Sequence, residues 1–132
     1  MESRVAAAVE KKRNGYNCAQ AIACTYCDLA GMDEETMYQM TQAFGAGFGN
    51  MQGTCGAISG ACAILGLINS KQGHNKGKTM QDTRQIMNEF YDRNHSVICK
   101  ELKGIETGTL LRGCDDCVKD AAEFLEKVLG EA

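Results

Sequence analysis

Residues 54–69 read TCGAISGACAILGLIN, and this stretch decides the fold that we expect. Thr54 is a suitable cap for a helix over residues 55–69, and the side chains that follow are apolar on almost every side of it. A helix of that kind is buried, so neighbouring helices must cover it on several sides. Small residues also let a neighbouring backbone approach closely: Cys55, Ser59, Cys62 and Gly66 form one strip, and Gly56 and Gly60 form another.

Capping residues and glycines predict further helices on both sides of this segment. We expect them at residues 3–13 after a Ser3 cap, at 17–30 with Gly31 as the stop, from Asp33 through Phe44, at 79–93 and at 115–129, with a short piece at 96–103. The glycine-rich stretch 45–49 interrupts the pattern, and loops are expected at 70–78 and 104–113. No run alternates with the period of two that is typical of a strand. The sequence therefore predicts an all-α, compact single-domain bundle over residues 1–132, with about six or seven helices around the central, small-residue-rich helix.

The composition bounds the function classes. The chain has 132 residues, 8 Cys, no Pro and a formal net charge of −3 at pH 7. Its Lys and Arg residues are scattered among acids, which argues against nucleic acid as a partner. No apolar run is long enough for a secretory signal or a membrane span, so we expect a cytoplasmic protein without membrane insertion. In that reducing compartment, abundant cysteine favours metal binding or redox chemistry over a permanent disulfide scaffold.

Three cysteines, Cys18, Cys55 and Cys114, stand where expected helices begin. Backbone N–H groups and the positive end of the helix dipole favour the thiolate there. Chemistry at sulfur is therefore our leading hypothesis. Cys18 is expected to face the core, whereas Cys24 and Cys27 fall on the opposite, more polar face of their helix, where they act as small helix residues or as a subunit contact.

Cys114 and Cys117 form a Cys-x-x-Cys pair before the last helix, which is the arrangement of a redox pair. Asp115 and Asp116 between them work against thiolate formation. An alternative stays open, in which Cys117 is ordinary core and Cys114 is a single distant ligand. Two other cysteines carry less information: Cys62 is expected to be a buried small hydrophobe, and Cys99 lies one turn after His95, which we expect to be a surface residue.

Four separated segments resemble the redox-active family called C_GCAxxG_C_C. They are Asn17-Cys18-Ala19-Gln20-Ala21, Gly53-Thr54-Cys55-Gly56-Ala57-Ile58-Ser59-Gly60-Ala61, Cys99-Lys100-Glu101-Leu102, and Cys114 ahead of Val118 and Asp120-Ala121-Ala122. The family label writes its core as GCAxxG, whereas this chain reads Cys55-Gly56-Ala57-x-x-Gly60, a difference that we take to be one of labelling. The resemblance spans nearly the whole chain. It implies redox activity without an assigned substrate, and it implies a functional set of Cys18, Cys55, Cys99 and Cys114.

Three classes of function follow. The first is a thiol-based redox or electron-transfer protein in which those four cysteines, together with Cys117, carry the reaction. In one version Cys18, Cys55, Cys99 and Cys114 hold an iron–sulfur cluster, and in the other, pairs of cysteines cycle between dithiol and disulfide. The second class is a module without turnover that binds zinc or copper(I) through the same four cysteines. The third is a structural all-α protein whose cysteines only pack.

The cofactor and the partner are left open by the sequence. Covalent c-type haem is not expected, because no Cys-x-x-Cys-His motif occurs. A redox partner is implied but not identified. Exposed apolar faces on a bundle of this size are compatible with a homodimer, although no helical seam is regular enough to predict one.

Overall fold

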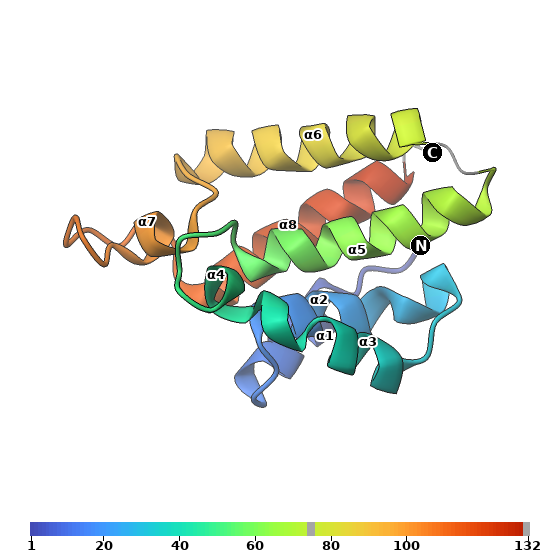
Figure 1. Cartoon of the computed structure of the whole chain (residues 1–132), viewed down its shortest axis with the longest axis horizontal. Helices are drawn as coiled ribbons and strands as arrows, with labels where there is room; N and C mark the ends of the chain where they lie inside the picture. The colour runs from blue at the N-terminus through green and yellow to red at the C-terminus, as the bar shows by residue number, and fades with distance from the viewer. Residues whose placement is uncertain (74–75, 131–132) are drawn as a thin grey trace.

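The structure, a computed structural model, describes residues 1–73 and 76–130 and is all-α within them (Figure 1). The fold class predicted from the sequence is therefore confirmed. The predicted number of helices was too low, since the described residues contain eight α-helices. They are α1 (Val5–Arg13), α2 (Cys18–Tyr26), α3 (Glu34–Met40), α4 (Gly45–Phe48), α5 (Gly56–Lys71), α6 (Lys76–Asn94), α7 (Cys99–Lys103) and α8 (Cys114–Gly130), with two short 3₁₀ helices, η1 (Cys27–Ala30) and η2 (Gln42–Phe44). The extra helix is α4, a single turn formed by the glycine-rich stretch that was expected only to interrupt the pattern.

Local signals place the starts of α2 and α3 and the end of η1 correctly. Asn17 caps α2 in a reciprocal arrangement with Gln20. The Gln20 backbone N–H donates to the Asn17 side chain over 2.8 Å, and the Asn17 backbone N–H donates to the Gln20 side chain over 3.0 Å. Gly31 ends η1 in the left-handed conformation that glycine adopts without strain. The Asp33 side chain accepts a hydrogen bond from the Thr36 backbone and caps α3. These three ends were predicted because their partners lie within a few residues in the sequence.

Two predicted caps are wrong. Arg4, not Ser3, is the N-cap of α1, and its backbone N–H donates to the Glu126 carboxylate over 2.7 Å. Cys55, not Thr54, is the N-cap of α5, because Thr54 forms an isolated antiparallel bridge with Ile98. In both cases a contact from a distant part of the chain moves the helix start by a residue.

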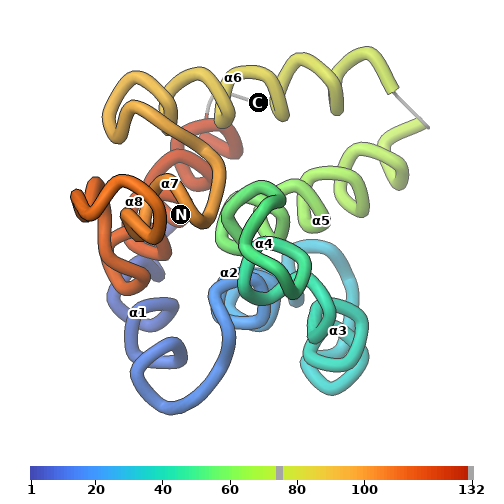
Figure 2. The backbone as a smooth tube through the Cα atoms, turned by 60° about the vertical axis from the view of Figure 1, so that its left-hand side comes forward, coloured from blue at the N-terminus to red at the C-terminus, as the bar shows by residue number. Residues whose placement is uncertain are grey.

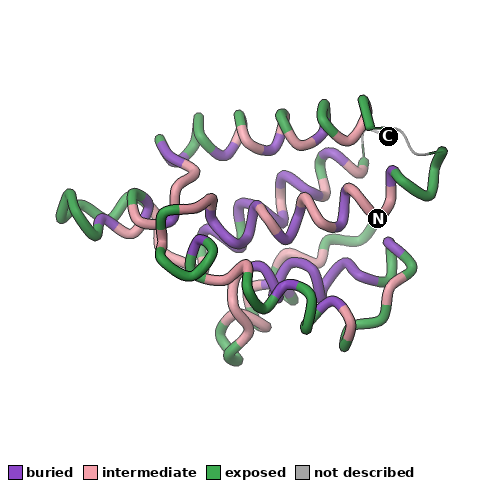
Figure 3. The backbone as a smooth tube through the Cα atoms, in the orientation of Figure 1, coloured by how far each residue is buried: buried purple, intermediate pink, exposed green. Residues whose placement is uncertain are grey.

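The helices form layers. Figure 1 shows α6 above, α5 and α8 in the middle, and α1 to α3 below, and α5 packs against α2, α6 and α8. The expected close approach occurs between α2 and α5: a Cβ atom built on Gly60 would lie 2.6 Å from the Ala19 carbonyl oxygen. Figure 3 shows the buried positions gathered on the facing sides of these helices. The small strip along α5 therefore sets the distance to α2.

The connection between α5 and α6 is shorter than expected. α5 continues to Lys71 and α6 begins at Lys76, so most of the loop predicted at 70–78 is helical. His74 and Asn75, which fall in that predicted loop, lie outside the described residues. None of the described helices combines the length and the apolar character that crossing a bilayer requires.

Candidate functional site

Four of the eight cysteines line one cavity of about 230 Å³. Each stands at the start of a different helix: Cys18 is the first residue of α2, Cys55 is the N-cap of α5, Cys99 is the first residue of α7 and Cys114 is the first residue of α8. These helix starts meet at the end of the molecule where α4 contacts α2, α5 and α7 (Figure 1, Figure 2). The cavity therefore collects the positive dipole ends of several helices around sulfur.

Backbone contacts hold the Cys55 and Cys99 segments together. The Cys55 N–H donates to the Val97 carbonyl over 2.8 Å, and the Cys99 N–H donates to the Gly53 carbonyl over 3.0 Å. Gly47 closes one side of the cavity with a left-handed φ of 57°, and a Cβ atom at this position would lie 2.6 Å from the Cys99 Cβ atom. A side chain there would push against Cys99, so glycine is required by both conformation and space.

Cys18 and Cys114 form a hydrogen-bonded thiol pair at the cavity. The Cys18 thiol, together with the positive charges of Lys103 and Lys12, lowers the pKa of Cys114 to about 5. The pKa of Cys18 is raised well above its ordinary value, because Cys18 is the donor of the pair and because burial disfavours its charged form. Cys114 is therefore the thiolate and Cys18 its proton-bearing partner, even though Asp115 and Asp116 flank the helix start.

Cys55 and Cys117 form a second pair with the same division of roles. The Cys117 thiol lowers the pKa of Cys55 to about 7, against the effect of burial, with help from the backbone N–H groups of Ala57 and Ile58 in the first turn of α5. The pKa of Cys117 is raised by the same interaction and by burial. Cys55 is 2% exposed and Cys117 is fully buried, so this pair is less accessible than the first.

Lys103 supplies the positive charge between the two pairs. Its Nζ atom donates to the Arg112 carbonyl over 3.2 Å and lies 3.5 Å from the Cys117 Sγ atom. Burial lowers the pKa of Lys103, but the four thiol groups of the two pairs outweigh burial and raise it overall. The ammonium group is therefore retained at the site and favours thiolates on both sides of it.

The remaining cysteines lie in different surroundings. Cys99 lines the cavity, but burial raises its pKa although Lys103 acts in the opposite direction. Cys62 is partly exposed and its pKa is raised by burial. The prediction that Cys24 and Cys27 lie on a polar face is wrong, because both are buried, and the Cys24 thiol donates to the carbonyl of Glu34 over 3.7 Å at the start of α3. Packing of α3 onto α2 covers the face that the sequence pattern left open.

Sequence reasoning missed the two lysines of the site. Lys103 was assigned to a short helical piece and Lys12 to the end of the first helix, and neither position suggested a role at sulfur. A signal for Lys103 existed, since it follows Cys99 by one helical turn and shares its side of α7. His95, by contrast, was predicted to be a surface residue and is exposed, immediately after the end of α6.

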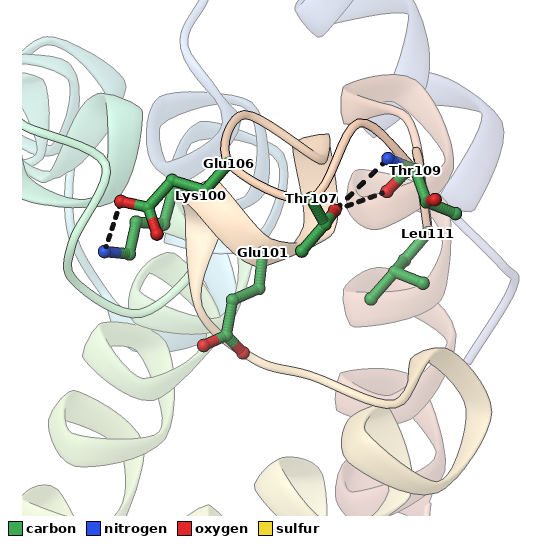
Figure 4. Close-up of a pocket in the computed structure, with 6 residues that line it drawn as sticks. All are labelled: Lys100, Glu101, Glu106, Thr107, Thr109 and Leu111. Atoms are coloured by element: carbon green, nitrogen blue, oxygen red, sulfur yellow. Dashed lines mark hydrogen bonds and ion pairs between the residues drawn. The ribbon is translucent and has the colours of Figure 1, made fainter.

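Figure 4 shows a second, larger cavity of about 460 Å³ between α7 and the loop that follows it. No cysteine lines it, and the Lys100 ammonium group points to Glu106 with a distance of 3.1 Å. The Thr107 hydroxyl group donates to the Thr109 carbonyl over 3.4 Å and accepts from the Thr109 N–H over 3.2 Å, and the lining residues offer no thiol. Chemistry rather than cavity size therefore selects the cysteine-lined cavity as the candidate site.

The geometry can be compared with the metal-binding hypotheses. Within residues 1–73 and 76–130, no three or more His, Cys, Asp or Glu side chains are arranged so that they could hold a metal ion. The four cysteines surround a cavity instead of converging on one point, and three of them are engaged in thiol pairs. All eight cysteines are free thiols in this structure.

The fold and the site define an all-α protein with paired thiols at the meeting point of helix starts. Residues 16–128 match the family described as "Putative redox-active protein (C_GCAxxG_C_C)". The chain belongs to this family. No curated protein matches the chain, and no solved structure matches it.

Proposed function

We propose that the protein is a thiol–disulfide redox protein in which Cys114 and Cys55 are the thiolates and Cys18 and Cys117 their resolving partners. The observation that carries this proposal is the presence of two thiol pairs beside one lysine, each pair joining a cysteine of lowered pKa to one of raised pKa. A low-pKa thiolate with a neighbouring thiol is the arrangement that disulfide exchange needs.

The chemistry balances with an external disulfide as oxidant. The Cys114 thiolate attacks one sulfur of that disulfide, which forms a mixed disulfide and releases one thiolate. Cys18 then gives up its proton and attacks the Cys114 sulfur, which forms the Cys18–Cys114 disulfide and releases the second thiolate. Two protein thiols are oxidised, two electrons reduce the external disulfide, and the proton of Cys18 goes to a released thiolate. Cys99, the fifth candidate from the sequence, keeps a raised pKa and serves as cavity wall in this scheme.

An iron–sulfur cluster is the second candidate, and the four cysteines around one cavity favour it. A cluster needs four cysteine ligands without a fixed spacing in the sequence. Cys18, Cys55, Cys99 and Cys114 would hold it, and it would supply one-electron transfer. In this version Lys103 and the helix starts stabilise the four thiolates rather than a nucleophile.

The other two alternatives have less support. Zinc or copper(I) binding asks for ligands that converge on a single ion, and the described side chains offer no such arrangement. A purely structural role accounts for the buried Cys24 and Cys27, but not for two thiols of lowered pKa beside a lysine. The proposal also includes a cytoplasmic location, a single domain with α5 as its central helix, and a separate redox partner.

The test is to purify the protein without air and then to oxidise it mildly. We expect a colourless, iron-free protein that forms Cys18–Cys114 and Cys55–Cys117 disulfides, mapped by alkylation and mass spectrometry. Cys55→Ser should lose the second disulfide, whereas the matched control Cys24→Ser should keep both. Broad visible absorption with iron and sulfide would support the cluster instead, and equal loss in the two variants would contradict the assignment of Cys55.

A further inference from the structure

The two thiol pairs differ in access to solvent. Cys18 and Cys114 are partly exposed, whereas Cys55, which lines the same cavity, is 2% exposed and Cys117 is fully buried. The Cys117 Sγ atom is enclosed by the Lys103 Nζ atom, 3.5 Å away, and by the Arg112 carbonyl oxygen, 3.8 Å away. An external disulfide therefore reaches the Cys18–Cys114 pair, called the outer pair here, before it reaches the Cys55–Cys117 pair, called the inner pair.

The pairs are connected through α8. Cys114 and Cys117 occupy its first turn three residues apart, a spacing that puts their Cβ atoms about 5–6 Å from each other on one face of the helix. A disulfide needs about 3.5–4.5 Å between Cβ atoms, so a Cys114–Cys117 bond requires the first turn to shift. Such a bond is strained and easily exchanged, which suits an intermediate between two better pairs.

We propose that the two pairs form a relay, in which the outer pair takes oxidising equivalents from a small external disulfide and passes them through Cys117 to the inner pair. This inference rests on the proposed function and adds that the site has a capacity of four electrons instead of two. The external disulfide must be small, because the cavity in front of Cys114 has a volume of about 230 Å³.

The relay balances as two internal exchanges. In the first exchange Cys117 attacks the Cys114 sulfur, which forms the Cys114–Cys117 disulfide and displaces Cys18. The proton of Cys117 passes to the displaced Cys18, which becomes a thiol again. The Cys55 thiolate then attacks the Cys117 sulfur, which forms Cys55–Cys117 and releases the Cys114 thiolate. No external oxidant is used in these steps, and the outer pair is ready for a second disulfide. Two external disulfides are then reduced to four thiols in all.

Lys103 stabilises the thiolates at both ends of this transfer. Its ammonium group acts on the thiols of both pairs, so it stabilises the Cys55 thiolate that attacks and the Cys114 thiolate that leaves in the second exchange. When the inner pair is oxidised, Cys114 is again the thiolate beside Lys103 and faces the cavity. The charge thus stays at the site while the disulfide moves inward.

The experiment follows disulfide positions over time after one equivalent of 4,4′-dithiodipyridine is added to the reduced protein. Samples are quenched with acid, alkylated and mapped by mass spectrometry. We expect Cys18–Cys114 to form first and to decline while Cys55–Cys117 rises, and two equivalents to yield both disulfides. Simultaneous formation of the two disulfides, or prior formation of the inner one, would overturn the relay while leaving the proposed function intact.

Two variants that break the same outer pair separate the relay from direct oxidation. In Cys18→Ser, Cys114 still reacts with the external disulfide and Cys117 resolves it, so the inner disulfide should form without an earlier Cys18–Cys114 disulfide. In Cys114→Ser the entry point is lost, and the inner disulfide should form at least about tenfold more slowly than in Cys18→Ser. Equal rates in the two variants would overturn the relay. Cys62→Ser is the matched control, and failure of all four cysteines to form any disulfide in the native chain would reject the proposed function itself.

Discussion

Replacing Lys103 with methionine removes the charge between the thiol pairs and keeps the apolar stem of the side chain. The Lys103 Nζ atom lies 3.5 Å from the Cys117 Sγ atom, and its charge lowers the pKa of both Cys114 and Cys55. An opposite charge at close range moves a pKa by about 1–3. Because Lys103 is partly exposed and solvent screens its charge, we take the lower end and expect Lys103→Met to raise both pKa values by about 1.

The consequence differs between the two thiolates. With a pKa of about 7, about half of Cys55 is ionised at pH 7, and a rise of about 1 leaves about a tenth, a fivefold loss of thiolate. With a pKa of about 5, Cys114 stays about nine-tenths ionised at pH 7 after the same rise. The loss of Cys114 thiolate becomes visible only at about pH 5–6. The variant should therefore oxidise its inner pair more slowly near neutral pH while its outer pair is little affected.

The assay is the ultraviolet absorbance of thiolate in reduced protein, titrated from about pH 4 to about pH 9. Both transitions should move to higher pH in Lys103→Met. Lys100→Met is the matched control, because this lysine is on the same short helix but pairs with Glu106 at a distance of 3.1 Å. Superimposable titration curves for the native protein and Lys103→Met would refute the assignment of the charge to the thiol site.

Three further predictions concern the stability of the reduced protein in urea. Gly60→Ala puts a methyl group 2.6 Å from the Ala19 carbonyl oxygen and should destabilise the fold by about 1–2 kcal/mol. The control Gly66→Ala adds a methyl group that meets nothing within 4 Å and should stabilise the fold by about 0.5–1 kcal/mol. Changes of the same sign would contradict the close packing of α2 and α5. Asp120→Ala removes the fully buried acceptor of Arg93 and Arg112 and should cost about 2–4 kcal/mol; a loss below about 1 kcal/mol would show that water replaces these ion pairs. Cys114 loses its proton at lower pH in the folded chain than in the unfolded one, so the free energy of unfolding should rise with pH from about 5 to about 8.5. Cys18 keeps its proton to higher pH in the folded chain, so the free energy of unfolding should fall again above about pH 9. A Cys114→Ser variant with an unchanged pH profile would count against this pair.

Helix boundaries could be predicted wherever the deciding contacts are local. Asn17 with Gln20, and Asp33 with Thr36, sit within one helical turn of their partners, so the sequence alone indicates these ends. The start of α1 could not be predicted, since it depends on a hydrogen bond from Arg4 to Glu126 at the other end of the chain. Local chemistry is visible in a sequence, and a partner more than a hundred residues away is not.

The candidate site could be predicted in part. Helix-start positions and the family resemblance pointed to the four cysteines that line the cavity, and the Cys-x-x-Cys spacing pointed to Cys117. The assignment of the thiols to pairs was out of reach, because Cys55 meets Cys117 and Cys18 meets Cys114 only after α5, α2 and α8 have packed. The contribution of Lys103 depends on the same packing.

The sequence by itself determined an all-α chain with several cysteines at helix starts, because helix periodicity, caps and the absence of strand patterns are properties of neighbouring residues. Only the tertiary structure decided which thiols touch, which of them are thiolates and which are shielded from solvent. A pKa depends on burial and on charges within a few ångströms. Lys12 and Lys103 supply those charges to Cys114, and helices from opposite parts of the chain bring these two lysines there.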